Sequence, residues 1–537
     1  MSRQADTGSD EARYAEGVKF SAYDGITTVV LGLVSAVLLA RVFGAEVLGA
    51  FAVASLLTGA FGTVSNVREG MGLVRELTRY EPRTPQARAL LWATLGFSAA
   101  LTVAMLAPFA VLAVYLIRDV FDRPELVEPF LLLVGLYVTV QNTGAVLSAP
   151  LVAYRAGRPL WISRTAMSLA LIGGAIACWA LGTTTVYGLI AATAAGALAA
   201  LAVELRALRR LTGLAVGPRD LRWGVGQMPR IISFGLRAAP SNYTETAINY
   251  ADTAVLAAYV PLAPLGAYNR AYGLFQRETS FVMSLSRLYF PTLCSLHAKH
   301  DLAGMRRVYR LTARYLILLM VPVGAWLAAA APAVMGAFGS DFQQAATALA
   351  ILGAVAAVNT YGKLSGAVSA AAGRPGRISI ATTVGAAVNV GLCFLLIPNG
   401  GLTGAALANL VGFGATTLLS MRFGARELET SIAGMLEPRY LGRLALACVP
   451  MTLAIAPLRD LDAALPIAVV LALPLFFLGL VLARPLRRSD GALLMRAARS
   501  AGLGSARVLA AIERTHELAS HEPRRLAPAP AASLGSP

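Results

Sequence analysis

Long apolar blocks alternate with short polar segments along this chain. Each block holds roughly 20 residues or more, the length that an α-helix needs to cross the hydrocarbon core of a bilayer. The pattern therefore predicts an all-α, polytopic membrane protein with about fourteen membrane-spanning helices. They fall near residues 20–42, 48–74, 89–117, 127–152, 161–181, 184–206, 234–259, 265–290, 309–337, 343–371, 377–397, 401–424, 441–458 and 464–484.

The composition supports this prediction. The 537 residues are 57% hydrophobic and 14% charged, and the mean hydropathy is +0.64. Soluble domains contain about 45–50% apolar and about 25% charged residues. The composition therefore excludes a set of water-soluble domains.

The net charge of +17 follows the predicted topology. Every second loop is basic, whereas the intervening loops carry little charge, mainly near 118–128, 341 and 459–462. Because cytoplasmic loops are enriched in Lys and Arg, we expect the basic loops and both termini to be cytoplasmic and to contact anionic membrane lipids. Basic residues spread over many loops form no single patch, which argues against a nucleic-acid partner.

Three landmarks occur twice, in the same order and at nearly the same spacing. At offsets of 216 or 217 residues, 48–51 reappear as 265–268, 156–159 as 372–375, and 187–189 as 403–405. We infer a duplicated block of six helices. Since six is an even number, both copies enter the membrane in the same orientation, which implies a pseudo-two-fold axis along the membrane normal.

The repeat and the charge pattern divide the chain into six segments. We expect a cytoplasmic N-terminal segment (1–18), a first six-helix lobe (19–206), a basic cytoplasmic linker (207–233), a second six-helix lobe (234–424), two further transmembrane helices (441–484) and a partly disordered, basic cytoplasmic tail (485–537).

Polar and acidic residues within one predicted span mark a candidate site. Span 234–259 carries Asn242, Glu245, Asn249 and Asp252 at intervals of three or four residues, which places them on one helix face. A charge at the bilayer centre costs at least about 2.5 kcal/mol and therefore normally faces a cavity or a partner. We expect these residues to line a cavity or hold a coupling ion. Alternatively, Glu245 and Asp252 pair with arginines of the next helix and only hold the helices together.

Those arginines are candidate phosphate ligands. Arg270 and Arg277 share one face of span 265–290. The planar guanidinium group binds phosphate oxygens through paired hydrogen bonds, so two arginines on one face suit a pyrophosphate. Arg68 and Lys363, inside other predicted spans, are further candidates for the same role.

Two more acidic residues lie within predicted spans. Asp24 lies near the start of the first span and Glu69 lies beside Arg68 in the second, and both are candidates for a polar cavity or a coupling-ion site. Alternatively, Asp24 interacts with a helix end, and Arg68 and Glu69 pair while the long arginine side chain reaches the interface.

The repeat places small residues opposite the acidic face. At an offset of 217, that face falls on Gly25, Thr28, Gly32 and Ser35. Small residues allow close approach of helices or substrate. We therefore expect a cavity whose polar groups come mainly from the second half.

Several function classes find no support in the sequence. No Gly-x-x-x-x-Gly-Lys-Ser/Thr loop for nucleotide binding occurs. The Cys and His residues have no metal-ligand spacing, so we expect no cofactor and no metal. No nucleophile–base pair is recognisable, and the outer loops are too short for a glycan-polymerising enzyme. We expect a transporter rather than an enzyme.

The chain resembles the polysaccharide transporter, or O-antigen flippase, family over about residues 17–485. The resemblance lies in residues 17–80, in Asp252 to Leu256 with the following Leu265 to Tyr272, and in Phe290-Pro291-Thr292-Leu293 before His300-Asp301. Lipid II flippases and multidrug exporters of the MATE type belong to the same multidrug/oligosaccharidyl-lipid/polysaccharide exporter superfamily.

The resemblance implies a V-shaped pair of six-helix lobes around a cationic cavity. The cavity would receive the head group of a polyprenyl-pyrophosphate-linked oligosaccharide and move it by alternating access to the outer leaflet of a bacterial cytoplasmic membrane. Asp252 and Arg270 match family positions best. Implied partners are H⁺ or Na⁺, a polysaccharide polymerase and glycosyltransferases. A MATE-like exporter of small molecules and a lipid II flippase remain alternatives.

Overall fold

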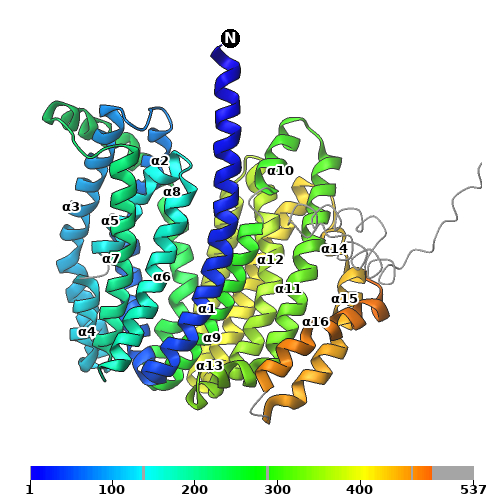
Figure 1. Cartoon of the computed structure of the whole chain (residues 1–537). Helices are drawn as coiled ribbons and strands as arrows, with labels where there is room; N and C mark the ends of the chain where they lie inside the picture. The colour runs from blue at the N-terminus through cyan, green and yellow to red at the C-terminus, as the bar shows by residue number, and fades with distance from the viewer. Residues whose placement is uncertain (1, 136–138, 286–288, 461–463, 486–537) are drawn as a thin grey trace, which may run out of the picture.

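The computed structural model describes residues 2–135, 139–285, 289–460 and 464–485 of the chain (Figure 1). Throughout these ranges the regular structure is helical, and no strand occurs in them. Local sequence signals account for several helix starts. Thr84 accepts a hydrogen bond from the amide of Ala87, and Asp301 accepts one from the amide of Gly304, as N-cap residues do. The all-α prediction is confirmed.

The helices follow one another along the chain with short connections. Up to residue 211 they are α1 (Ser2–Val64), α2 (Glu69–Leu77), α3 (Pro85–Tyr115), η1 (Leu116–Val120), η2 (Pro124–Leu126), α4 (Val127–Leu133), α5 (Thr139–Ala153), α6 (Gly157–Ala180) and α7 (Val186–Leu211). After it come α8 (Pro218–Tyr259), α9 (Leu262–Leu285), α10 (Tyr289–Ala298), α11 (Leu302–Phe338), η5 (Ser340–Ala345), α12 (Ala346–Ala371), α13 (Gly376–Glu427), α14 (Ile432–Leu436), α15 (Pro438–Ile455), η6 (Ala456–Asp460) and α16 (Ala464–Ala483).

Nine helices within the described ranges are long and apolar enough to cross a membrane, so the chain is a multi-pass membrane protein. Two of them, α1 and α13, each cover two predicted spans. They continue through Gly44 (φ 76°, ψ 172°) and Gly401 (φ 50°, ψ −130°), conformations that glycine tolerates. The predicted spans outside the nine fall on the short α4 and α5 and on the charged α8 and α9. The count of fourteen stays a prediction.

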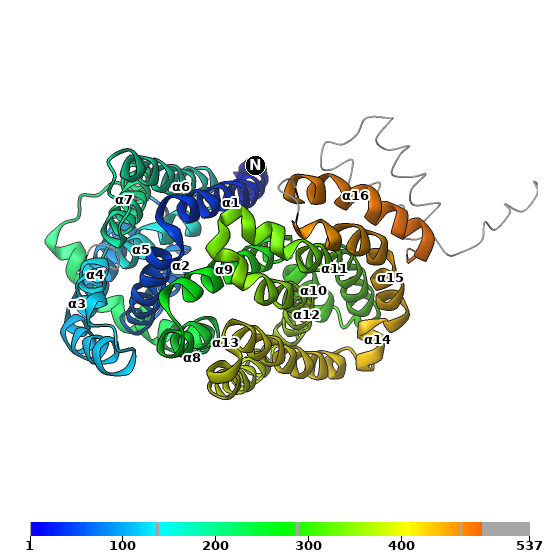
Figure 2. The same ribbon diagram turned by 90° about the horizontal axis from the view of Figure 1, so that it is seen from below.

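Two groups of helices stand side by side, as the view from below shows (Figure 2). Helices α1 to α7 form one group, and α9 to α16 form the other. At one end of the molecule α1 and α9 meet in close contact. A methyl group added at Gly49 would overlap the Leu262 carbonyl, and one added at Gly266 would overlap the Ala45 carbonyl. Gly266 follows Gly49 by 217 residues, and Leu262 follows Ala45 by the same offset. This reciprocal contact is the one that a pseudo-two-fold axis between duplicated lobes requires.

Helix α8 belongs structurally to both groups. The expected linker 207–233 is largely helical, because α7 continues to Leu211 and α8 begins at Pro218. Gly224 packs against Ala89 of α3, and Gly72 of α2 packs against Ile231. Further along, α8 contacts α13 of the second lobe. Contact of α8 with the first lobe continues to Gly235, which lies against Val67 and Arg68. The division of the chain at residue 233 stays a prediction.

Candidate functional site

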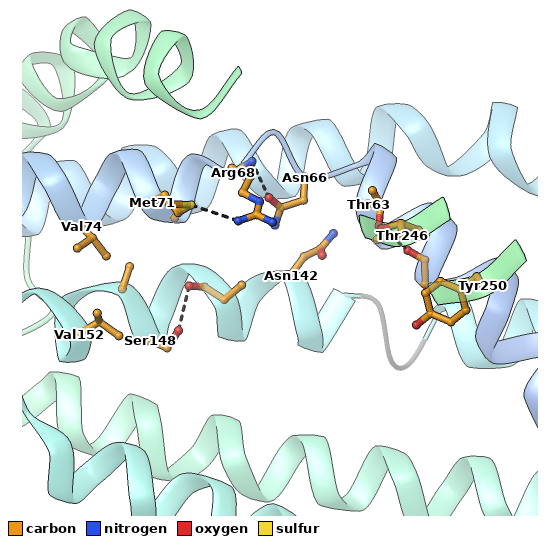
Figure 3. A pocket seen from close by; sticks show the side chains of 15 residues that line it. Thr63, Asn66, Arg68, Met71, Val74, Asn142, Ser148, Val152, Thr246 and Tyr250 are labelled. Atoms are coloured by element: carbon orange, nitrogen blue, oxygen red, sulfur yellow. Dashed lines mark hydrogen bonds between the residues drawn. The ribbon is translucent and has the colours of Figure 1, made fainter. Parts of the chain in front are cut away.

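Three adjoining cavities meet around Tyr250 of α8. The first-lobe pocket, of about 550 Å³, lies between α1, α2, α5 and α8 (Figure 3). The α9 pocket, of about 360 Å³, lies between α1, α8 and α9. The arginine cavity, of about 300 Å³, contains Arg270. Tyr250 lines all three, and Gly59 and Ser55 of α1 each line two. Together they form a polar space between the lobes.

Arg270 brings positive charge to this space, and Arg277 lies on the same helix near α1. Arg270 lines the arginine cavity beside Thr58, and its Nε atom is buried without a hydrogen-bond partner. Arg277 lies against α1, where a methyl group on Gly32 would come within 3.0 Å of its Nε. Among the described residues neither guanidinium forms an ion pair. The small residue at position 32 thus makes room for a cation from the other lobe.

Asp252 has a separate environment, fully buried inside the second lobe. Its Oδ2 accepts hydrogen bonds from the hydroxyl of Tyr268 (2.5 Å) and from Nδ2 of Asn409 (2.7 Å). Its Oδ1 accepts one from the amide of Thr253 (2.6 Å). Asn389 donates to Oδ1 of Asn409 (3.2 Å) and extends the network. The alternative in which Asp252 pairs with Arg270 or Arg277 is therefore wrong.

Asn249 lies one turn before Asp252 and does face the cavity. It lines the α9 pocket, and its Oδ1 accepts hydrogen bonds from Tyr272 (3.3 Å) and Gln276 (3.3 Å). The backbone of α8 includes Asn242 and Glu245, but their side chains lie outside the described residues. The predicted polar face thus splits between the cavity and the interior of the second lobe.

The second predicted span breaks at the charged residues. Helix α1 ends at Val64, and Arg68 takes a left-handed conformation (φ 59°) before α2 begins at Glu69. Arg68 lines the first-lobe pocket. Glu69 is fully buried, and neither carboxylate oxygen has a hydrogen-bond partner. The alternative in which Arg68 and Glu69 pair is therefore wrong.

The remaining two candidates lie away from the arginines. Asp24, 8% exposed, accepts a hydrogen bond from Arg164 of α6 (2.5 Å), so this acid joins two helices of the first lobe. Lys363 is half-buried on α12 and is not among the residues that line the arginine cavity. The structure thus does not bring Lys363 together with Arg270.

Several residues of the site carry no charge and were not among the predicted site residues. Tyr268, Asn389 and Asn409 surround Asp252, and Asn409 follows it by 157 residues. Asn142, in a predicted span, donates to Ser65 (3.0 Å) on the wall of the first-lobe pocket. Polar groups of the first half therefore contribute more to the cavity than we expected.

The cavity is closed at the end where Gly49 and Gly266 meet, and two arginines of the first lobe reinforce this closure. Arg41 donates to the carbonyls of Ala337 (2.8 Å) and Gly336 (3.2 Å) near the end of α11. Arg123 donates to the carbonyl of Val260 (2.7 Å) after α8. Cations stabilise helix C-termini, so these bonds hold the lobes together at the closed end.

We expect the double variant Arg41→Ala/Arg123→Ala to open this end about tenfold more often, since hydrogen bonds from charged groups contribute about 1.5–3 kcal/mol each and exposure weakens them. Spin labels at the exposed residues Glu46 and Asp341 report the distance between the lobes by electron resonance. Arg118, exposed at the same end, gives the matched control Arg118→Ala. A double variant with the wild-type distance distribution would show that these bonds do not hold the end closed.

Comparison with known proteins agrees with this architecture. A family model described as "Polysaccharide biosynthesis protein" matches residues 38–347. The chain belongs to this family. The chain is also similar to the probable low-salt glycan biosynthesis flippase Agl15 of Haloferax volcanii, with 23% identity over 226 residues. The match covers 40% of this chain and about half, 47%, of the relative.

Solved structures show the same fold. The lipid II flippase MurJ in an inward closed conformation superposes with a TM-score of 0.66 at 14% identity, covering 86% of this chain and 97% of MurJ. An inward-facing MATE family transporter of the MOP superfamily gives a TM-score of 0.61 at 14% identity, covering 78% of this chain and 99% of the transporter. The chain therefore has the fold of these transporters, as its resemblance to the superfamily implied.

Proposed function

We propose that this protein is a flippase for a polyprenyl-pyrophosphate-linked oligosaccharide, which it moves from the cytoplasmic to the outer leaflet for surface polysaccharide biosynthesis, such as that of O-antigen or exopolysaccharide. One observation carries the proposal. Arg270 lines the arginine cavity, Arg277 lies where α9 meets Gly32 of α1, and neither has an ion-pair partner among the described residues. Two such guanidinium groups suit the oxygens of a pyrophosphate.

Alternating access is the proposed mechanism. The Gly49–Leu262 and Gly266–Ala45 contacts close one end of the molecule. The first-lobe pocket extends from Tyr250 toward Val74 and Val152, in the direction of the basic loops (Figure 3). With the basic loops in the cytoplasm of a bacterial cell, the head group enters from the cytoplasmic side. Opening of the closed end then releases it on the outer side, while the lipid tail stays in the bilayer.

A coupling ion, H⁺ or Na⁺, is proposed to act at Asp252. This carboxylate joins α8 to Tyr268 of α9 and to Asn409 of α13. The same α8 carries Asn249 and Tyr250 on the cavity wall. An ion that changes the hydrogen bonds of Asp252 would thus change the packing of a helix that lines the cavity. Glu69, buried without a partner, is a second candidate for this role.

Two other transport functions are compatible with the same fold. A MATE-like, cation-coupled exporter would also use a buried carboxylate such as Asp252, but Arg270 in the cavity favours an anionic head group over a cationic drug. A lipid II flippase would share the pyrophosphate and differ in the sugar and peptide. In either flippase the polymerase and glycosyltransferases of the pathway are the expected partners.

Reconstituted protein tests the proposal directly. Proteoliposomes receive the lipid-linked glycan fraction extracted from cells that lack the gene, and a parallel set receives ethidium. We expect the wild type to move the glycan lipid between leaflets and to leave ethidium where it was added. Export of ethidium without movement of the glycan lipid would replace the flippase by the small-molecule exporter.

A further inference from the structure

The wall of the first-lobe pocket is made of groups that both donate and accept hydrogen bonds. Its polar side chains are amides and hydroxyls from Thr63, Asn66, Asn142, Ser148, Thr246 and Tyr250, together with the cation Arg68 (Figure 3). Among the lining residues whose side chains are described, none is acidic. This wall differs from that of the arginine cavity, where a cation stands among mostly apolar side chains.

Several of these groups have unused hydrogen-bonding capacity directed at the pocket. The Asn142 amide nitrogen donates to Ser65 (3.0 Å) and Thr102 (3.0 Å), which leaves its oxygen as an acceptor. Asn66 accepts from the amide of Arg68 (2.7 Å) through its oxygen, which leaves its nitrogen as a donor. The Tyr250 hydroxyl forms no hydrogen bond to a described residue.

Mixed donors and acceptors select among ligand chemistries. A phosphate offers only acceptors and a metal cation requires carboxylates or carbonyls, whereas each sugar hydroxyl both donates and accepts. The volume of about 550 Å³ lies within the range of about 300–1,000 Å³ that small-molecule sites occupy. The pocket therefore fits a short, uncharged oligosaccharide.

Tyr250 adds an aromatic surface at the junction of this pocket with the arginine cavity. A methyl group on Gly59 would lie 2.8 Å from the Tyr250 hydroxyl and 3.2 Å from Cε2, so glycine at this position gives the ring its place against α1. The face of an aromatic ring is negative, and the C–H face of a sugar ring is weakly positive, so the two stack.

We propose that the first-lobe pocket binds the sugars next to the pyrophosphate, with Tyr250 as the stacking surface, while Arg270 and Arg277 bind the phosphates. The inference rests on the proposed flippase function. Because Tyr250 lines both the pocket and the arginine cavity, sugar and phosphate subsites adjoin each other.

Binding to purified protein in lipid nanodiscs tests this assignment with two probes. One is undecaprenyl pyrophosphate, which carries no sugar; the other is the lipid-linked glycan fraction from cells that lack the gene. We expect Tyr250→Leu to weaken binding of the glycan lipid about tenfold and to leave the sugar-free lipid within about twofold. Arg270→Gln should weaken binding of both.

A second variant fills the pocket without removing a polar group. Val152→Trp places a large ring at the end of the pocket opposite Tyr250, and it should exclude the glycan lipid while still allowing the sugar-free lipid to bind. Val111→Trp, on a residue 73% exposed on α3, is the matched control.

The outcomes separate the two proposals. Equal loss of both lipids in Tyr250→Leu and Val152→Trp, or loss of neither, would overturn the sugar subsite while the flippase proposal stands. A wild type that binds neither lipid would overturn the proposed function, and the sugar subsite with it.

Discussion

We expect replacement of both Arg270 and Arg277 with alanine to abolish transport of the proposed lipid-linked glycan and to leave the protein in the membrane. Each arginine supplies charge-assisted hydrogen bonds, which contribute about 1.5–3 kcal/mol, so loss of both lowers transport by about 100-fold or more. No described residue pairs with either guanidinium, so their removal leaves no described acid without its partner. Polysaccharide export by the variant in cells that lack the native gene, normalised to membrane abundance, measures the effect.

A single exposed arginine provides the control. Arg230 lies on α8 and donates only to Gln227, one turn earlier on the same helix (3.3 Å). Arg230→Ala should transport at the wild-type rate, which shows that loss of the cavity charge, not of net charge, stops transport. Normal export by the Arg270→Ala/Arg277→Ala variant would remove the arginines from the binding site.

Replacing Asp252 with alanine has the second large effect, on stability as well as on transport. The substitution removes the acceptor of the Tyr268 hydroxyl, the Asn409 amide and the Thr253 amide. A buried donor left without a partner costs about 1–3 kcal/mol, and Tyr268 and Asn409 keep their bond to each other (2.9 Å). We therefore expect Asp252→Ala to lower the free energy of unfolding by about 2–4 kcal/mol, as measured by thermal denaturation in detergent.

Asn249→Ala is the matched control for stability, because Asn249 lies on the same helix and accepts only two hydrogen bonds, both of 3.3 Å. Asn249→Ala should lower the free energy of unfolding by about 1 kcal/mol or less. Asp252→Asn keeps the shape of the side chain and should fold, but transport by this variant should no longer respond to an imposed H⁺ or Na⁺ gradient. A gradient response as large as that of the wild type would exclude Asp252 as the coupling site.

Most of the architecture follows from the hydrophobic pattern. The repeat at an offset of 217 predicted two equivalent lobes, and the Gly49–Leu262 and Gly266–Ala45 contacts are equivalent at that offset. The continuous course of α8 from Pro218 into the span 234–259 was not predicted, because residues 207–233 are basic and contain two prolines. Pro218 occupies the first turn of α8, where proline is tolerated, and packing against α2 and α3 stabilises the rest.

The candidate site could be predicted only in part. Charged residues inside apolar spans stand out, which is why Arg270, Arg277 and Asp252 were found. Helix spacing does not reveal which neighbouring helix a side chain meets, so it could not show that Asp252 contacts Asn409 instead of an arginine. Tyr250 was missed because an aromatic residue in an apolar span has no distinguishing pattern.

The measurement that tests the central claim most directly is the leaflet distribution of polyprenyl-pyrophosphate-linked glycans in cells that lack this gene. Mass spectrometry identifies the lipids, and a membrane-impermeant reagent shows which of them face outward. The flippase account predicts that the lipid-linked glycan accumulates on the cytoplasmic leaflet and that the wild-type gene, but not the Arg270→Ala/Arg277→Ala variant, restores its outward exposure. An unchanged amount and sidedness of these lipids would contradict it.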